Sequence, residues 1–282
     1  MESGASDGGG RTALAMPLLH QLTLIFVLAA SPAPADPAAG VKDLGHIMFL
    51  GNSFIEGHSS PNLSWQGGSR KVIEDILTAK KIRFEFVGRN QSNSRGMANP
   101  KHNGFGGIGI TDLLEGITRE GVPMGSLTHW LKESPADIYV IDIGRSENEG
   151  SSVSELKIQF MKLLRKIFST SPKARIIWSE QTAPKPIWFP QAQAHLHRAN
   201  LALNELSVEQ SELGRCLLIA KVAKNWNPDL HLDTDGVHAS DGGYQYLGQA
   251  QAKLLLSMPA IALEPGAKGL RRATFATTRK TQ

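Results

Sequence analysis

From residue 45 onward, short apolar runs alternate with longer segments whose apolar residues recur at helical spacing. This alternation predicts an α/β domain, because parallel strands need a long crossover, usually a helix, before the next strand can pair. The apolar runs predict strands over residues 46–50, 83–87, 138–143, 175–178 and 216–222. The periodic segments predict helices over residues 69–80, 153–168, 192–213 and 241–256.

Length and composition fit one well-buried core, since the chain has 282 residues, of which 41% are hydrophobic and 20% charged. The net charge is +4. The basic residues are nevertheless scattered, aromatic residues make up only 6%, and no basic stripe carries interleaved aromatics. We therefore expect no nucleic-acid partner.

The N-terminus resembles an export signal. An apolar run from Leu22 to Ala30 precedes a small-x-small pattern that ends at Ala35, which predicts cleavage after Ala35. Acidic residues ahead of this run are atypical, so translation from Met16 stays open. The run is shorter than the roughly 20 apolar residues of a membrane span, and we expect no stable span. The expected organisation is a signal peptide over 1–35, a linker over 36–44, one domain over 45–258 and a basic, disordered tail over 259–282, in a secreted, periplasmic or cell-envelope protein.

Two further features bear on function. Residues 89–110 are polar and glycine-rich, which predicts an irregular loop of the kind that often carries function. The single cysteine, Cys216, excludes an internal disulfide. Its neighbours are apolar, which predicts a buried strand thiol, and nothing beside it would lower its pKa toward that of a catalytic thiol.

Chemistry in an open parallel sheet gathers beyond the carboxyl ends of the strands. Ser53 follows the first predicted strand after Gly51 and Asn52. Gly51 permits a sharp turn there, which would present the Ser53 hydroxyl and N–H to a cleft. A serine in this place also fits a helix N-cap, so its context has to decide between cap and nucleophile.

A serine nucleophile needs a general base, and the base needs an acceptor that fixes its tautomer. Asp235 and His238 can form that pair, because Gly236 between them allows the loop to fold back. The alternative makes Asp235 a helix cap and His238 a surface residue. Candidate donors to an oxyanion are the N–H of Ser53, the N–H of Gly109 and the side-chain amide of Asn148.

The Gly51-Asn52-Ser53 opening and the Asp235-Gly236-Val237-His238 close resemble the first and last sequence blocks of the SGNH (GDSL-like) hydrolase superfamily. Gly109-Ile110-Thr111 resembles the second block. The α/β-hydrolases are a poorer match, since Ser53 lacks the second glycine of their Gly-x-Ser-x-Gly elbow. Two departures stand out: Asn52 replaces the commoner aspartate, and Asn148 lies two positions beyond the asparagine of the third block.

The resemblance implies a three-layer α/β/α sandwich around a flavodoxin-like, five-stranded parallel sheet. It also implies a serine esterase that needs no cofactor or metal and forms an acyl-enzyme with Ser53, Asp235 and His238. The expected substrate is a small-molecule or glycan ester, with carbohydrate O-acetyl groups favoured; acyl transfer in place of hydrolysis stays open, and the sequence does not indicate an oligomeric state.

Two other functions stay open. A metal-dependent phosphoesterase could use the ligand-rich cluster at the end of the domain, which comprises His231, Asp233, Asp235 and His238. A non-catalytic carbohydrate- or envelope-binding module on an esterase-like fold could stack sugars on Trp65, Trp188 and Trp226.

Overall fold

The computed structural model describes residues 41–58, 67–187 and 190–260. The predicted signal peptide and nearly all of the predicted basic tail lie outside these residues, as do Trp65 and Trp188.

A parallel sheet forms the centre of the domain. Its main strands are β1 (Asp43–Gly51), β2 (Arg83–Val87), β6 (Ile138–Asp142), β7 (Arg175–Ser179) and β8 (Cys216–Ala220). They pair in the order β2-β1-β6-β7-β8, which confirms the flavodoxin-like arrangement. A sixth, two-residue strand, β3 (Asn103–Gly104), pairs with the end of β1.

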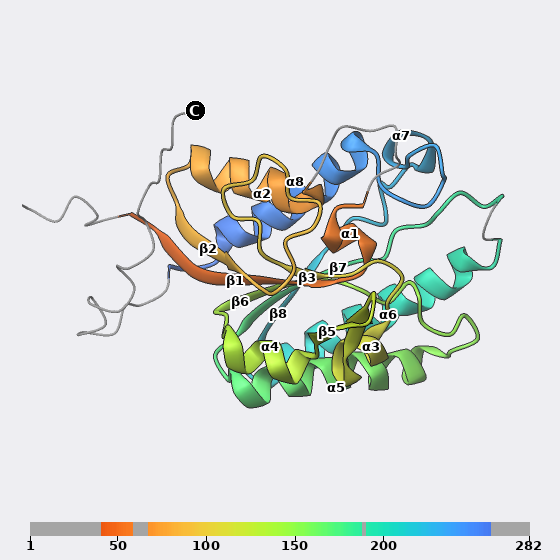
Figure 1. Ribbon diagram of the computed structural model, residues 1–282. Helices are drawn as coiled ribbons and strands as arrows, with labels where there is room; N and C mark the ends of the chain where they lie inside the picture. The colour runs from red at the N-terminus through yellow and green to blue at the C-terminus, as the bar shows by residue number, and fades with distance from the viewer. Residues whose placement is uncertain (1–40, 59–66, 188–189, 261–282) are drawn as a thin grey trace, which may run out of the picture. The chain divides into compact units, whose positions relative to one another are not determined.

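Helices cover both faces of the sheet, as Figure 1 shows. On one face, α2 (Gly68–Ala79) packs against α8 (Asp241–Ser257), and on the other α5 (Val153–Thr170) packs against α6 (Ala192–Glu212). Each face has its own apolar core, and every residue of β6 is buried between the two. Burial on both faces explains why the strands read in the sequence as continuous apolar runs.

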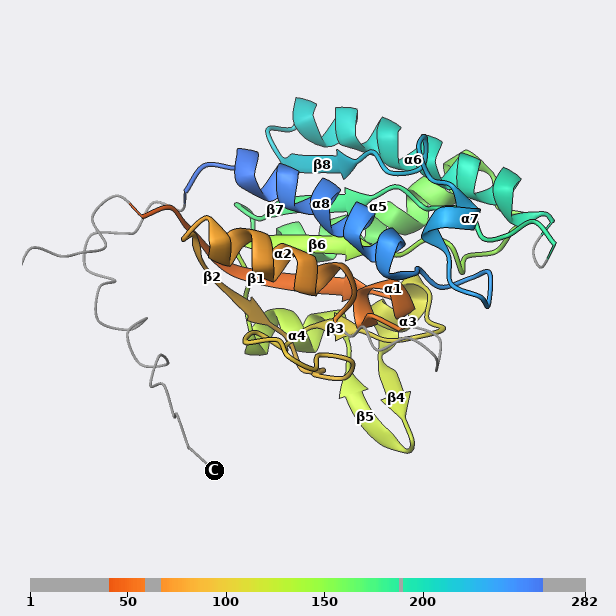
Figure 2. The ribbon, with the colours of Figure 1, turned by 90° about the horizontal axis from the view of Figure 1, so that it is seen from above.

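Shorter elements lie around the carboxyl edge of the sheet (Figures 1 and 2). α4 (Leu127–Glu133) packs against α5 and directly precedes β6, whereas the elements at this edge are α1 (Ser53–Glu56), α3 (Ile110–Glu115), α7 (Pro228–His231) and a hairpin of β4 (Ile117–Arg119) with β5 (Val122–Gly125). Figure 2 shows this hairpin extending away from the sheet. The periodicity of the sequence did not predict these elements. Residues 89–110 are irregular as predicted, apart from β3, an isolated bridge between Asn90 and His102, and the first residue of α3.

The observed boundaries differ slightly from the predicted ones. β1 begins at Asp43, so the predicted start of the domain at residue 45 falls inside this strand. Cys216 is half-buried rather than buried, and burial raises the pKa of its thiol although the neighbouring Ile176 backbone and Arg175 lower it. Among the described residues, no helix is long and apolar enough to cross a membrane.

Candidate active site

Ser53 is the first residue of α1, directly beyond the end of β1. The helix cap is Asn52, whose Oδ1 accepts the N–H of Phe54 at 3.0 Å. The Asn52 N–H in turn donates to the main-chain oxygen of Asp142 at 3.2 Å, which ties the turn to β6. The capping role that competed for Ser53 thus belongs to its neighbour. The Ser53 hydroxyl forms no hydrogen bond with any described residue.

Asp235 and His238 lie in the loop that leads into α8. The Asp235 Oδ2 is 2.7 Å from His238 Nδ1, while its Oδ1 accepts the N–H groups of Val237 and His238 at 2.9 Å each. Burial alone would raise the pKa of Asp235, but hydrogen bonds from the His238 ring and these two N–H groups outweigh it and lower the pKa. An ionised Asp235 makes Nδ1 the protonated nitrogen and leaves Nε2 as the acceptor.

The structure brings His238 to the turn that Ser53 begins. The His238 ring centroid lies 4.3 Å from that of His58 and 6.4 Å from that of Phe54. His58 itself donates its N–H to the Ser53 carbonyl at 2.9 Å. From the first turn of α8, the Tyr244 hydroxyl donates to the His58 carbonyl. The first and last sequence blocks therefore meet at one edge of the sheet.

A glycine segment passes beside the same turn. β3 places Gly104 against Gly51, and a Cβ at position 104 would lie 2.5 Å from the Glu56 nitrogen, so α1 packs directly on this backbone. A Cβ at position 106 would lie 3.7 Å from Ser53 Cβ. The main chain of Gly106 is thus a close neighbour of Ser53.

Gly109, the predicted second donor, lies at the N-cap of α3. Its N–H donates to the Asp112 carboxylate at 2.8 Å, and the next N–H, that of Ile110, donates to Glu147 at 2.8 Å. The geometry therefore does not favour Gly109 as an oxyanion donor, because its hydrogen already caps a helix. Gly107 has a φ of +76° and an N–H with no acceptor among the described residues. The consecutive glycines Gly106 and Gly107 are a signal in the sequence from which Gly107 could have been chosen as a candidate donor.

Asn148 lies in an exposed loop beyond β6. Its Oδ1 accepts the Gly150 N–H at 3.0 Å. No hydrogen bond joins its side chain to the Ser53 turn within the described part of the chain.

Arg145, which the sequence did not single out, lies beside the turn that Ser53 begins. Its guanidinium lies 3.7 Å from the Phe54 ring centroid and donates to the Thr182 carbonyl at 3.2 Å. It also faces Asp142 at 3.5 Å, and the two side chains are only 13% and 2% exposed. Burial raises the pKa of Asp142 to about 6, although Arg145 and a hydrogen bond with Gln181 lower it. Arg145, which Asp142 and Thr182 hold in place, thus packs on Phe54, the residue directly after Ser53.

The side chains of the alternative sites have other partners. His231 accepts the Asn227 N–H at 3.0 Å and stacks on Tyr246, while Asp233 accepts the Thr234 N–H. Among residues 41–58, 67–187 and 190–260, no three His, Cys, Asp or Glu side chains form a group that could hold a metal ion. Trp226 is buried and donates to the Ala183 carbonyl, so it packs in the core instead of offering a face to a sugar.

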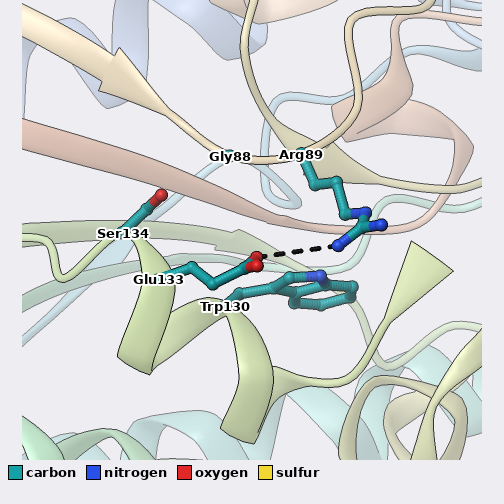
Figure 3. Close-up of a pocket in the computed structure, with 5 residues that line it drawn as sticks. All are labelled: Gly88, Arg89, Trp130, Glu133 and Ser134. Atoms are coloured by element: carbon teal, nitrogen blue, oxygen red, sulfur yellow. Dashed lines mark ion pairs between the residues drawn. The ribbon is translucent and has the colours of Figure 1, made fainter.

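Two hollows lie beyond β2, and Arg89 lines both of them. The smaller, about 140 Å³, is lined by Gly88, Arg89, Trp130, Glu133 and Ser134. Figure 3 shows Arg89 directed at Glu133 across it, with a separation of 3.7 Å. The larger, about 500 Å³, runs from Arg89 and His129 along the β4–β5 hairpin. Ser53 and His238 line neither hollow.

No family model matches the chain, and no curated protein matches it. Solved structures do. A family 3 carbohydrate esterase of Clostridium thermocellum aligns with 78% of this chain and 100% of its own, at a TM-score of 0.60 and 18% identity. An acetyl esterase mutant solved with an acetate ion covers 75% of this chain and 96% of its own, at 0.60 and 17%. A lipase/acylhydrolase from Enterococcus faecalis covers 77% and 99%, at 0.52 and 17%. Such similarity establishes a shared fold.

Proposed function

We propose that this chain, which has the fold of the SGNH (GDSL-like) hydrolases, is a serine esterase that cleaves carboxylic esters through an acyl-enzyme. Ser53 is the proposed nucleophile, His238 its general base and Asp235 the acceptor that orients the base. One observation carries the proposal: the hydrogen-bonded Asp235–His238 pair lies against the turn that Ser53 begins.

In the proposed reaction, Ser53 Oγ attacks the ester carbonyl and its proton passes to His238 Nε2. Asp235, ionised and bonded to Nδ1, stabilises the imidazolium that forms. The imidazolium then gives the proton to the leaving alcohol as the tetrahedral intermediate collapses. A water molecule, activated by the same imidazole, hydrolyses the acyl-Ser53 ester and regenerates the hydroxyl. A hydrogen bond between the Ser53 hydroxyl and His238 Nε2 is expected to form when substrate binds.

The oxyanion of the intermediate requires preorganised donors. We assign two of them to the N–H groups of Ser53 and Gly107, both of which lack an acceptor among the described residues. Gly107 takes the place of Gly109, since the Gly109 N–H caps α3. Asn148 is the proposed third donor, because its Oδ1 is held by Gly150 and its amide hydrogens remain available.

The proposed substrates are esters with short acyl groups, and carbohydrate O-acetyl groups in particular. Two structural neighbours support this choice by name, one a carbohydrate esterase and the other an acetyl esterase. The export signal predicted at the N-terminus is consistent with an extracellular glycan ester. A secreted, periplasmic or cell-envelope location remains a prediction of the sequence.

A panel of p-nitrophenyl esters from acetate to palmitate tests the proposal. We expect the highest kcat/KM on acetate, full activity after exhaustive treatment with EDTA, and loss of turnover in Ser53→Ala. An added alcohol acceptor that raises the rate would identify acyl transfer. Activity that disappears with EDTA and persists in Ser53→Ala would contradict the proposal and favour a metal-dependent hydrolase.

A further inference from the structure

Two charged side chains hold the main chain of Gly106 from opposite sides. Glu56 Oε2 accepts the Gly106 N–H at 2.6 Å, and the Arg119 guanidinium donates to the Gly106 carbonyl oxygen. The other Glu56 oxygen accepts the hydroxyl of Ser92 at 2.9 Å, which fixes the carboxylate. Neither Glu56 nor Arg119 belongs to the proposed triad.

This arrangement lies next to the proposed nucleophile. A Cβ placed on Gly106 would be 3.2 Å from Glu56 Oε2 and 3.7 Å from both Arg119 Nη2 and Ser53 Cβ. Glu56 comes from α1, the helix that Ser53 begins, whereas Arg119 ends β4 on the hairpin visible in Figure 2.

The Gly106–Gly107 peptide needs such restraint. Glycines have the largest range of backbone conformations, so two in succession leave the peptide between them free to rotate. This peptide is trans, and its C=O and N–H groups therefore point in opposite directions. When Arg119 binds the Gly106 carbonyl oxygen, it also sets the direction of the Gly107 N–H. Charge-assisted bonds are stronger than neutral ones, which suits Arg119 and Glu56 to this task.

We propose that Arg119 and Glu56 are positioning residues that preorganise the Gly107 N–H as an oxyanion donor. The inference rests on the proposed function and adds to it a role for the β4–β5 hairpin. An oxyanion donor acts mainly in the transition state, so its misalignment lowers kcat and leaves KM nearly unchanged.

Arg119→Met is the main test, with neutral p-nitrophenyl acetate as substrate and a boronic acid as a tetrahedral analogue. We expect kcat to fall roughly 10- to 100-fold. This loss is at most comparable to the loss of one complete oxyanion donor, which costs about 10²- to 10³-fold. Affinity for the boronic acid should fall in parallel, while KM stays within about twofold. Arg119→Lys should recover part of kcat, and Arg165→Met, at an exposed position on α5, should match the wild type. Glu56→Gln should resemble a milder form of Arg119→Met.

Several outcomes would overturn the inference. An unchanged kcat in Arg119→Met would do so. A change confined to the KM of negatively charged esters would also do so, because the guanidinium would then bind the substrate directly. The proposed function fails separately: if Ser53→Ala retains turnover, the nucleophile is wrong whatever Arg119→Met does.

A second measurement does not depend on activity. The ¹⁵N relaxation of the Gly107 amide should report a rigid N–H in the wild type, with an order parameter of about 0.85, and a flexible one below about 0.6 in Arg119→Met. Equal order parameters in the two proteins would contradict the proposal even if no substrate were known.

Discussion

Gly51 packs so closely on Asp142 that a Cβ at position 51 would lie 2.1 Å from the Asp142 carbonyl oxygen. The contact fixes the end of β1 against β6, directly before Asn52 and Ser53. The position of the proposed nucleophile therefore depends on a residue without a side chain.

Gly51→Ala should destabilise the protein and displace Ser53. The added methyl cannot fit without moving main-chain atoms, and such overpacking typically costs about 1–3 kcal/mol or more. Urea unfolding measures the free energy of unfolding, and kcat reports the displacement. Gly150→Ala is the control for the free energy of unfolding alone, because a Cβ there would be 3.5 Å from its nearest neighbour, Asn148 Oδ1, which is an ordinary contact. Equal stability of the two variants would refute the packing argument.

The buried pair of Asp142 and Arg145 should show strong coupling in a double-mutant cycle. Asp142→Asn leaves a guanidinium buried without its counter-charge, and breaking a buried pair in this way costs about 3–5 kcal/mol. The double variant Asp142→Asn/Arg145→Met should lose less stability than the sum of the single variants. The exposed pair Lys71–Asp75 supplies the comparison, with an expected cost below about 1 kcal/mol for Lys71→Met. Additive losses at Asp142 and Arg145 would show that the two residues act independently.

His102 should make stability fall in mild acid. Burial, followed by the Arg70 charge, lowers the pKa of His102 to about 3, although the Ser92 carbonyl raises it. Between pH 6.5 and 3 the unfolded chain therefore binds a proton that the folded protein does not, and stability declines as the pH falls through this window. The decline attributable to His102 is at most about 1.4 kcal/mol per pH unit.

Urea unfolding of His102→Gln between pH 6.5 and 4.5 checks this expectation, because the variant should have a flatter profile than the wild type whatever its absolute stability. The same substitution at His197, which is exposed on α6, should leave the slope unchanged. Parallel profiles for the wild type and His102→Gln would contradict the assignment.

Asn148→Ala and Asn148→Asp together test the proposed third donor. Aspartate retains an oxygen for the Gly150 N–H but offers no hydrogen to an oxyanion. If Asn148 is a donor, both variants should lose about 10²- to 10³-fold in kcat. Wild-type kcat in both would remove Asn148 from the site and leave two main-chain donors.

The sheet and the four long helices were predictable because the hydrophobic pattern of each extends over enough residues to distinguish strand from helix. β6 is apolar from Ile138 to Ile141, and α5 repeats apolar residues at helical spacing. The β4–β5 hairpin gave no such signal, since it is short and Val122 is 56% exposed. β3 has only two residues and owes its pairing to the end of β1.

In the candidate site, local spacing identified the Asp235–His238 pair, and the hydrogen bond between them is present. The choice of Gly109 as a candidate donor did not take into account Asp112, three residues on, whose carboxylate accepts the Gly109 N–H at the cap of α3. Arg119 and Arg145 could not have been found in this way. The proposed role of Arg119 depends on its contact with Gly106, and Arg145 contacts Phe54; only the fold brings each arginine to its partner.

Covalent labelling shows whether Ser53 is the nucleophile and whether His238 activates it. Folded protein is treated with a fluorophosphonate, and the modified residue is located by peptide mass spectrometry. We expect a single adduct on Ser53 that is absent in Ser53→Ala and forms roughly 10⁴-fold more slowly in His238→Ala. A folded wild type that leaves Ser53 unmodified, or a His238→Ala variant labelled at the wild-type rate, would contradict this expectation.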